Sequence, residues 1–261
     1  MKILVTNDDG FQARGIHHLA KWLSPFGKVI VVAPDGPRSA QSMAITVNVP
    51  LRLSPIPAPD SNSDSNIEWY SVNGTPVDCV KLAMNTIFRD EKPDMVVAGI
   101  NHGSNSAVNV IYSGTMGAVM EGCICNIPSI GFSLTSHDPM ADFAPCKPFV
   151  EILAAGVLKH GLPENVCLNV NIPDIDGVPE GMRVVRACRG RWTEEYKEYK
   201  DPQGKNFYML TGSFINEEPE AEDTDEWCLS HRLVSVVPTT PERTAPRGEW
   251  PKWLDEMSFV I

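Results

Sequence analysis

The sequence predicts an α/β fold in which a mostly parallel sheet is flanked by helices and followed by a β-rich C-terminal extension. Short apolar runs, such as Ile3-Leu4-Val5 and KVIVVA at residues 28–33, have the length and β-branched content of buried parallel strands. A segment with helical spacing separates these two runs, which is the pattern of a right-handed βαβ unit. From residue 173 onwards, short strand-like segments alternate with charged loops instead.

The other elements of the predicted core follow in the same order. The first helix has Ile16, Leu19 and Leu23 on one face and stops at Pro25-Phe26-Gly27. Another helix begins at Thr75-Pro76, because threonine can cap a helix and proline fits its first turn. We expect extended segments at 43–53 and 67–72 around an exposed loop at 54–66, strands at 95–100, 129–134 and 166–172, and helices from 116 and near 147–160.

We divide the chain into a core, residues 1–175, and a C-terminal extension, residues 176–261. The extension has strand-like segments at 183–187, 207–210 and 233–237, and a charged loop at 217–226. Its tail carries Trp250, Trp253, Leu254 and Met257 at helical spacing. Exposed aromatic residues of this kind favour a contact between subunits, although packing back onto the same chain fits the pattern equally well.

The charge balance argues against nucleic-acid polymers as partners. The chain has 22 basic and 33 acidic residues, a net charge of −11, and no basic stripe to displace counterions. An anionic substrate would therefore need local attraction from a metal ion or a helix N-terminus.

The cysteines and the apolar runs indicate a cytoplasmic protein without membrane contact. Seven cysteines at irregular spacings form no C-x-x-C pair and no zinc set, and we expect Cys79, Cys167 and Cys188 to be packed thiols. No apolar run approaches the length of a membrane span, and Met1-Lys2 leads directly into a strand.

Four oxygen-bearing side chains follow three strands of the predicted sheet. Asp8 and Asp9 follow the first strand, Ser39 lies in the loop after the second, and Asn101 follows the strand at 95–100. The carboxyl ends of parallel strands meet at one edge, and two adjacent carboxylates there repel each other unless a positive charge lies between them. Hydroxyl, amide and carboxylate oxygens suit Mg²⁺, Mn²⁺ or Ca²⁺. The alternative interpretation of residues 8–10 is an exposed Asp-Asp-Gly turn without a metal. The G-x-G-x-x-G pattern typical of dinucleotide binding is absent after the first strand.

A helix start at Ser113-Gly114-Thr115 offers hydroxyl and backbone N–H groups that suit a phosphate. An ordinary N-cap explains the same residues.

Several short motifs occur in a fixed order along nearly the whole chain. They are Thr6-Asn7-Asp8-Asp9-Gly10, Ala33-Pro34-Asp35 with Ser39, Gly74-Thr75-Pro76-Val77-Asp78-Cys79, Gly99-Ile100-Asn101-His102-Gly103-Ser104-Asn105, Tyr112-Ser113-Gly114-Thr115, Leu168-Asn169-Val170-Asn171-Ile172-Pro173 and Thr224-Asp225. Together this ordered set resembles the stationary-phase survival protein SurE family of 5′/3′-nucleotidases.

The resemblance implies a Rossmann-like core that hydrolyses nucleoside 5′- and 3′-monophosphates to nucleoside and phosphate. It implies one divalent ion, Mg²⁺ or Mn²⁺, and a homodimer or homotetramer formed through C-terminal exchange. By position, Asp8, Asp9, Ser39 and Asn101 would be the metal ligands, and Ser113, Gly114 and Thr115 would hold the phosphate. The chain departs from the family pattern at Ala40 and Ala107, where glycine is common, at Asn109, where aspartate is frequent, and at Arg232-Leu233, where Gly-Tyr is found.

Metal-assisted hydrolysis is the chemistry that we expect of these residues. Asp8 or Asp9 could also act as a base or nucleophile, but the Asp-x-Asp pattern followed by Thr that marks aspartyl-phosphate enzymes is missing, which favours ligation. His102 is a possible proton donor to the leaving group, although a lone loop histidine is more often incidental. Two other classes stay open: a nucleotide-sugar transferase that uses Asp-Asp for a metal diphosphate, and a non-catalytic nucleotide or metal sensor.

Overall fold

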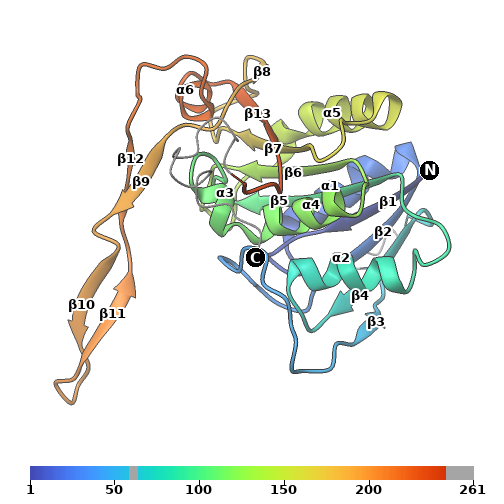
Figure 1. The fold of residues 1–261 in the computed structure, drawn as a ribbon, viewed down its shortest axis with the longest axis horizontal. Helices are drawn as coiled ribbons and strands as arrows, with labels where there is room; N and C mark the ends of the chain where they lie inside the picture. The colour runs from blue at the N-terminus through green and yellow to red at the C-terminus, as the bar shows by residue number, and fades with distance from the viewer. Residues whose placement is uncertain (59–63, 245–261) are drawn as a thin grey trace, which may run out of the picture.

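Nine strands form one central sheet in the computed structural model, which describes residues 1–58 and 64–244. The strand order is β3-β4-β2-β1-β5-β6-β7-β13-β8, and the neighbours from β4 through β7 all run parallel (Figure 1). The edge strand β3 pairs antiparallel with β4, β13 pairs antiparallel with β7, and the other edge strand, β8, runs parallel to β13. The bounds are β1 Lys2–Thr6, β2 Lys28–Pro34, β3 Leu53–Pro55, β4 Ile67–Val72, β5 Met95–His102, β6 Ser129–Leu134, β7 Cys167–Ile172, β8 Met182–Val184 and β13 Val234–Thr239.

Helices cover both faces of this sheet because strand side chains alternate between two apolar clusters. Ile3 and Val5 of β1 pack with residues of α1 and α5, whereas Leu4 packs with residues of α2 and α4. The helices are α1 Arg14–Leu23, α2 Pro76–Asn85, α3 Asn109–Tyr112, α4 Gly114–Ile124, α5 Lys147–His160 and α6 Asp225–Ser230, with short 3₁₀ turns at Ser24–Phe26 and Ala144–Cys146. The predicted α/β class with a mostly parallel, helix-flanked sheet is confirmed.

The strand order reverses between β1 and β5. From β1 the chain moves outward through β2 and β4 in one direction and through β5, β6 and β7 in the other. In open parallel sheets a crevice forms at the carboxyl ends of the two strands where the order reverses, and ligands bind there. The loops after β1 and β5 carry the acidic and amide residues singled out in the sequence.

Two antiparallel ribbons extend from the body of the molecule and form what we call the arm, residues 190–216. Strands β9 Gly190–Thr193 and β12 Ser213–Asn216 form its base, and β10 Tyr196–Lys200 pairs with β11 Asn206–Leu210 in its outer part. Figure 1 shows the arm pointing away from the central sheet, and every residue of β10 and β11 is exposed.

The rest of the extension packs on the body of the molecule. Strands β13 and β8 continue the central sheet beyond β7, and α6 packs against β13. The strand-like segments predicted at 183–187, 207–210 and 233–237 correspond to β8, β11 and β13. Strands β9, β10 and β12 and helix α6 were not predicted.

The extended segment predicted at 43–53 is largely wrong, because a strand begins only at Leu53. Instead of pairing with a neighbouring strand, this segment is held by the first turn of α2. The Thr46 N–H donates to Asp78 Oδ1 at 3.0 Å, and the Thr75 hydroxyl donates to the Ala44 carbonyl at 2.7 Å. Ser54 and Pro55, expected in the loop, belong to β3.

The remaining predictions concern the start of α2, the cysteines, membrane-spanning helices and the C-terminal tail. The predicted N-terminus of α2 is confirmed, since Thr75 and Asp78 form a capping box with Pro76 in the first turn. All seven cysteines are free, and Cys79, Cys167 and Cys188 are buried as expected. Within the described ranges, no helix has both the length and the apolar character needed to span a membrane. The predicted helical tail with Trp250 and Trp253 lies outside the described residues.

Candidate active site

A cavity of about 550 Å³ lies at the point where the strand order reverses. Its lining includes Asp8 from the loop after β1, Ser39 from the loop after β2, Asn101 from the end of β5 and Ser113 from the start of α4. The structure thus brings together side chains that are up to 105 positions apart, from 8 to 113, at one edge of the sheet. This is the arrangement that the sequence pattern predicted for that edge.

The turn after β1 fixes the direction of the two acidic side chains. The fully buried Asn7 closes it, because its amide donates to the Gly10 carbonyl at 2.9 Å and accepts the Gly10 N–H at 3.2 Å. Gly10 has φ +94°, and a Cβ there would lie 3.0 Å from the carbonyl carbon of Gly36. Glycine is therefore required at this position for the turn to form against the loop after β2.

Asp8 is a buried carboxylate with a defined hydrogen-bond partner. The side chain of Asp8 accepts a hydrogen bond of 2.5 Å from the Thr115 hydroxyl, and its backbone carbonyl accepts the Arg38 N–H at 2.6 Å. Burial, and then the neighbouring charge of Asp9, raise the pKa of Asp8 to about 6. A cation beside this carboxylate would offset both effects.

Asp9 is less buried than Asp8 and lies towards β5. Its Oδ2 accepts the His102 backbone N–H over 3.4 Å, and burial raises the pKa of its carboxyl. His102 lines the cavity, its ring meets Phe143 edge-on at 5.0 Å, and its buried Nδ1 has no hydrogen-bond partner. The role of His102 as a proton donor stays a prediction.

Asn101 and Ser39 supply the neutral oxygens of the set. The Asn101 amide nitrogen donates to the Gly103 carbonyl at 2.8 Å, so the opposite end of the side chain, Oδ1, is the end left for a cation. Ser39 lies exposed in the loop that follows β2. In the described part of the chain, no three His, Cys, Asp or Glu side chains gather as a metal site, so any ion here depends on these neutral oxygens as well as on two carboxylates.

The start of α4 packs directly against Asp8. Ser113 caps the helix by accepting the Met116 N–H at 3.0 Å, and Thr115 is fully buried with its hydroxyl directed at Asp8. A Cβ on Gly114 would lie 2.9 Å from the Asp8 Cβ, so a larger residue would push the helix away. Both hydroxyls are thus used within the protein, and the first backbone N–H groups of the helix are the donors that suit a phosphate.

Buried asparagines of β7 hold the loop that follows β5. Asn171 Oδ1 accepts the Asn105 N–H at 2.7 Å, and Asn169 donates to the Asn105 carbonyl at 2.8 Å. The Asn105 side chain in turn donates to Ser133 at 2.8 Å. These contacts explain the Asn-x-Asn pattern at 169–171, which sequence analysis noted without a role.

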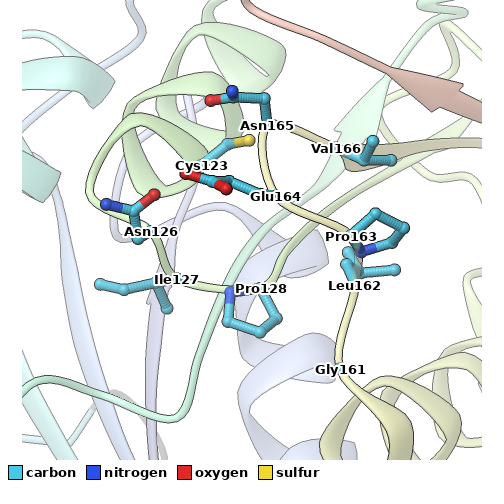
Figure 2. Close-up of a pocket in the computed structure, with 10 residues that line it drawn as sticks. All are labelled: Cys123, Asn126, Ile127, Pro128, Gly161, Leu162, Pro163, Glu164, Asn165 and Val166. Carbon is cyan, nitrogen blue, oxygen red and sulfur yellow. The ribbon is translucent and has the colours of Figure 1, made fainter.

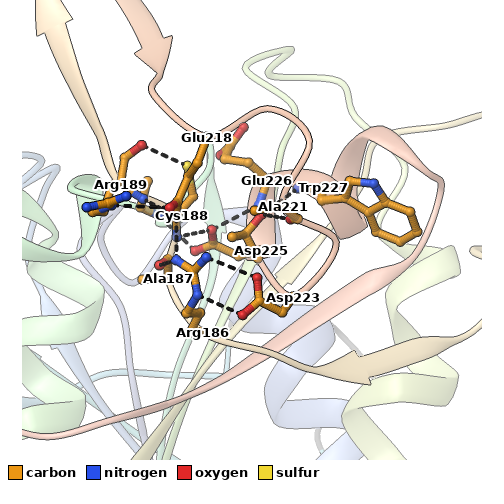
Figure 3. Close-up of polar contacts among 12 residues, drawn as sticks. Arg186, Ala187, Cys188, Arg189, Glu218, Ala221, Asp223, Asp225, Glu226 and Trp227 are labelled. Carbon is orange, nitrogen blue, oxygen red and sulfur yellow. Dashed lines mark hydrogen bonds and ion pairs between the residues drawn. The ribbon is translucent and has the colours of Figure 1, made fainter.

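Asp225 joins the same loop to the extension, and Figure 3 shows its carboxylate beside Cys188. Its fully buried carboxylate accepts the Ala107 N–H and the Cys188 N–H, each at 2.8 Å, and the Glu226 N–H at 2.9 Å. Sequence analysis placed Asp225 in a charged loop. The available signal was the order Thr-Asp-Glu, a capping residue followed by acids, which is typical of a helix N-terminus.

A second cavity of about 400 Å³ lies at the opposite edge of the sheet. It is formed by the loops that precede β6 and β7, with Asn126–Pro128 on one side and Gly161–Val166 on the other (Figure 2). None of the predicted site residues lines it. The first cavity is the candidate active site, because it lies at the carboxyl ends of the strands and is lined by Asp8 and Asn101.

Comparisons with known proteins identify the family. The model of the family described as Survival protein SurE matches residues 3–194. The 5′-nucleotidase SurE of Bacteroides fragilis is 48% identical over 243 residues, which cover 93% of this chain and 92% of that protein. The protein of the same name from Flavobacterium psychrophilum is 49% identical over 244 residues, covering 93% of each.

A solved structure agrees with the sequence matches. The SurE protein from Aquifex aeolicus is 34% identical, with a TM-score of 0.78 over 94% of this chain and 95% of that chain. The matched family region contains every residue of the candidate site that sequence analysis named, from Asp8 to Thr115. With its ordered motifs, its sheet topology and these matches in agreement, this chain belongs to the SurE family.

Proposed function

We propose that this chain is a phosphomonoesterase that hydrolyses nucleoside 5′-monophosphates, and also 3′-monophosphates, to nucleoside and phosphate. The relatives named 5′-nucleotidase SurE, up to 49% identical across nearly the whole chain, support this reaction. The observation that carries the proposal is the convergence of Asp8, Ser39 and Asn101 in one cavity beside the start of α4.

We propose that one divalent cation, Mg²⁺ or Mn²⁺, is held by Asp8, Asp9, Ser39 and Asn101. The donor set fits such an ion, since all four ligands are hard oxygens and the buried Asp8 has a pKa raised to about 6 by burial and by the charge of Asp9. A bound divalent cation supplies positive charge that stabilises the phosphate in the transition state.

The protein positions these groups through its own contacts. Thr115 and the backbone of Arg38 fix Asp8, and Gly103 fixes the amide of Asn101. The N-terminus of α4 directs its N–H groups and its positive dipole end to the substrate phosphate. This local attraction is needed because the net charge of −11 opposes the approach of an anion.

We also propose that the chain forms a homodimer or homotetramer through the extension, residues 176–261. Support comes from the outer part of the arm, where Tyr199 and Phe207 stack with ring centroids 5.6 Å apart, both about 40% exposed. Exposed aromatic residues on a projecting ribbon favour a protein partner, and a second copy of the chain supplies the same surface. Sedimentation of the intact chain beside a Tyr199→Ser, Phe207→Ser variant tests this, since loss of the larger species is expected in the variant.

Phosphate release from adenosine monophosphate in the presence of Mn²⁺ tests the proposed reaction. We expect turnover with Mn²⁺ and none after chelation by EDTA, with recovery when Mn²⁺ is restored. Binding of the nucleotide without phosphate release would indicate a sensor, and product formation that requires a sugar acceptor would indicate a transferase.

A further inference from the structure

An aromatic recess of about 380 Å³ opens beside the candidate active site. Its lining includes Ala40, Asn109 and Tyr112 from the body of the molecule and Trp192, Tyr196 and Leu210 from the arm. Five of these six residues also line the active-site cavity, all except Tyr196. The recess is therefore a continuation of the cavity that contains Asp8 and Asn101, and a ligand held at one end can reach the other.

Trp192 is the fixed wall of this recess. The indole Nε1 donates to Asn109 Oδ1 at 2.8 Å, and the ring of Phe214 meets it edge-on with centroids 5.9 Å apart. The side chain is half-buried, so part of its surface stays open to a ligand. An indole held from two sides loses little conformational entropy when a planar ligand stacks on it.

The chemistry of the recess matches a nucleobase better than a second phosphate. Tyr112 and Tyr196 are 53% and 68% exposed, and with Trp192 they offer aromatic faces to which a heterocycle can stack. The acidic Glu195 and the hydroxyl-bearing Thr211 also line the recess, and their oxygens can accept hydrogen bonds from the edge of a nucleobase. A carboxylate in that place repels a further anionic group.

We propose that this recess binds the base of the nucleotide and that Trp192 is a specificity-determining residue. The inference rests on the proposed function, because the phosphate end of the cavity must hold the phosphate for the base to reach the recess. It assigns Trp192 of β9, together with Tyr196 and Leu210 at the near ends of β10 and β11, to the substrate. The rest of the outer ribbon, with Tyr199 and Phe207, is left for the proposed subunit contact. A purine covers more of the indole face than a pyrimidine, so purine nucleotides are favoured.

The test compares adenosine monophosphate with ribose 5-phosphate, which carries the same phosphate on a sugar without a base. We expect Trp192→Ala to lower the ratio of the two kcat/KM values about tenfold, the size of a lost stacking contact. Trp192→Phe keeps an aromatic face and should retain most of the ratio. Trp227→Ala is the matched control, because Trp227 of α6 stacks on His231, the residue that follows this helix, and lines neither cavity.

Direct binding of adenosine, measured by calorimetry, gives a readout that does not depend on turnover. Weaker adenosine binding by Trp192→Ala, and by Tyr112→Ala in case the first variant fails to fold, supports the inference. An unchanged ratio, an equal loss with both substrates, or a change of oligomeric state without a change of ratio would overturn it. If the wild-type chain hydrolyses both substrates and only the ratio test fails, the proposed function stands, whereas hydrolysis of neither would reject both.

Discussion

Thr115 donates a hydrogen bond of 2.5 Å to Asp8, joining the first turn of α4 to the loop after β1. Both side chains are buried, and this contact lowers the pKa of Asp8 against the larger opposing effects of burial and of Asp9. The contact gives Thr115 a role in positioning a proposed metal ligand.

Replacing Thr115 by valine removes that donor while keeping the shape of the side chain. We expect the free energy of unfolding to fall by about 1.5–3 kcal/mol, the value of a hydrogen bond to a charged group, and Mn²⁺ to bind more weakly. Urea unfolding and calorimetric titration measure the two effects. Thr115→Ser, which retains the hydroxyl, is the control, and equal behaviour of the valine and serine variants would contradict this role.

Asp225→Asn tests the clamp between the extension and the loop after β5. An amide in place of the carboxylate cannot accept from Ala107, Cys188 and Glu226 together, so we expect a loss of about 1–3 kcal/mol in stability. Amide hydrogen exchange at Ala107 should become faster. Asp223→Asn on the same segment is the control, because Asp223 is exposed and pairs with Arg186 at the surface (Figure 3). Equal exchange rates in both variants would exclude a clamp.

Ala40 has φ +58°, a left-handed conformation that disfavours a Cβ. This explains the glycine commonly found at that place in the family pattern. We expect Ala40→Gly to stabilise the protein by about 0.5–1 kcal/mol. Glycine relieves the backbone strain of the folded state, and this gain is larger than the cost of the greater conformational entropy that glycine gives the unfolded chain. Ala155→Gly in α5 makes the same chemical change in a helix and should destabilise by about 1 kcal/mol. Thermal unfolding measures both changes in stability, and changes of the same sign in the two variants would refute the explanation.

Glu218 makes part of the stability depend on pH. The guanidinium of Arg186, together with the backbone and side chain of Arg189, lowers the pKa of Glu218 from its ordinary 4.5 to about 2. When the pKa of a carboxyl is lower in the folded protein than in the unfolded chain, its ionised form stabilises the fold. This stabilisation is fully present at a pH above the pKa of the unfolded chain, and it is lost as the pH falls towards the pKa in the folded protein.

The stability difference between wild type and Glu218→Gln should therefore be constant above about pH 5 and should decrease below pH 4.5. Urea unfolding at stepped pH measures it. Arg186→Gln removes the main ion-pair partner of Glu218, so the pH-dependent contribution of Glu218 to stability should become smaller in that variant. A difference that grows on acidification would contradict the assigned ion pair.

The core could be predicted because its signals are local. Runs such as Ile3-Leu4-Val5 are buried on both sides of a parallel sheet, and the loops that follow them share one edge whatever the details of packing. That rule alone placed Asp8, Ser39 and Asn101 together.

The parts that could not be predicted depend on distant partners. The apolar residues at 43–53 favour a strand, but the acceptor that holds Thr46 is Asp78, far along the chain. Likewise, no sequence pattern indicates that the Thr115 hydroxyl donates to Asp8 instead of pointing towards the substrate. Trp192 lies in a polar segment, and its place beside the cavity depends on how the arm joins the body.

Calorimetric titration of Mn²⁺ into the wild-type chain and into Asp9→Asn tests the central claim most directly. We predict one ion per wild-type chain and binding at least about tenfold weaker in Asp9→Asn. The melting temperature of Asp9→Asn should not fall, since repulsion between two adjacent carboxylates is relieved. Asp174→Asn, an exposed acid after β7 at the same sheet edge, should bind as the wild type does. One ion bound to Asp9→Asn with wild-type affinity, together with full phosphate release from adenosine monophosphate, would contradict the account.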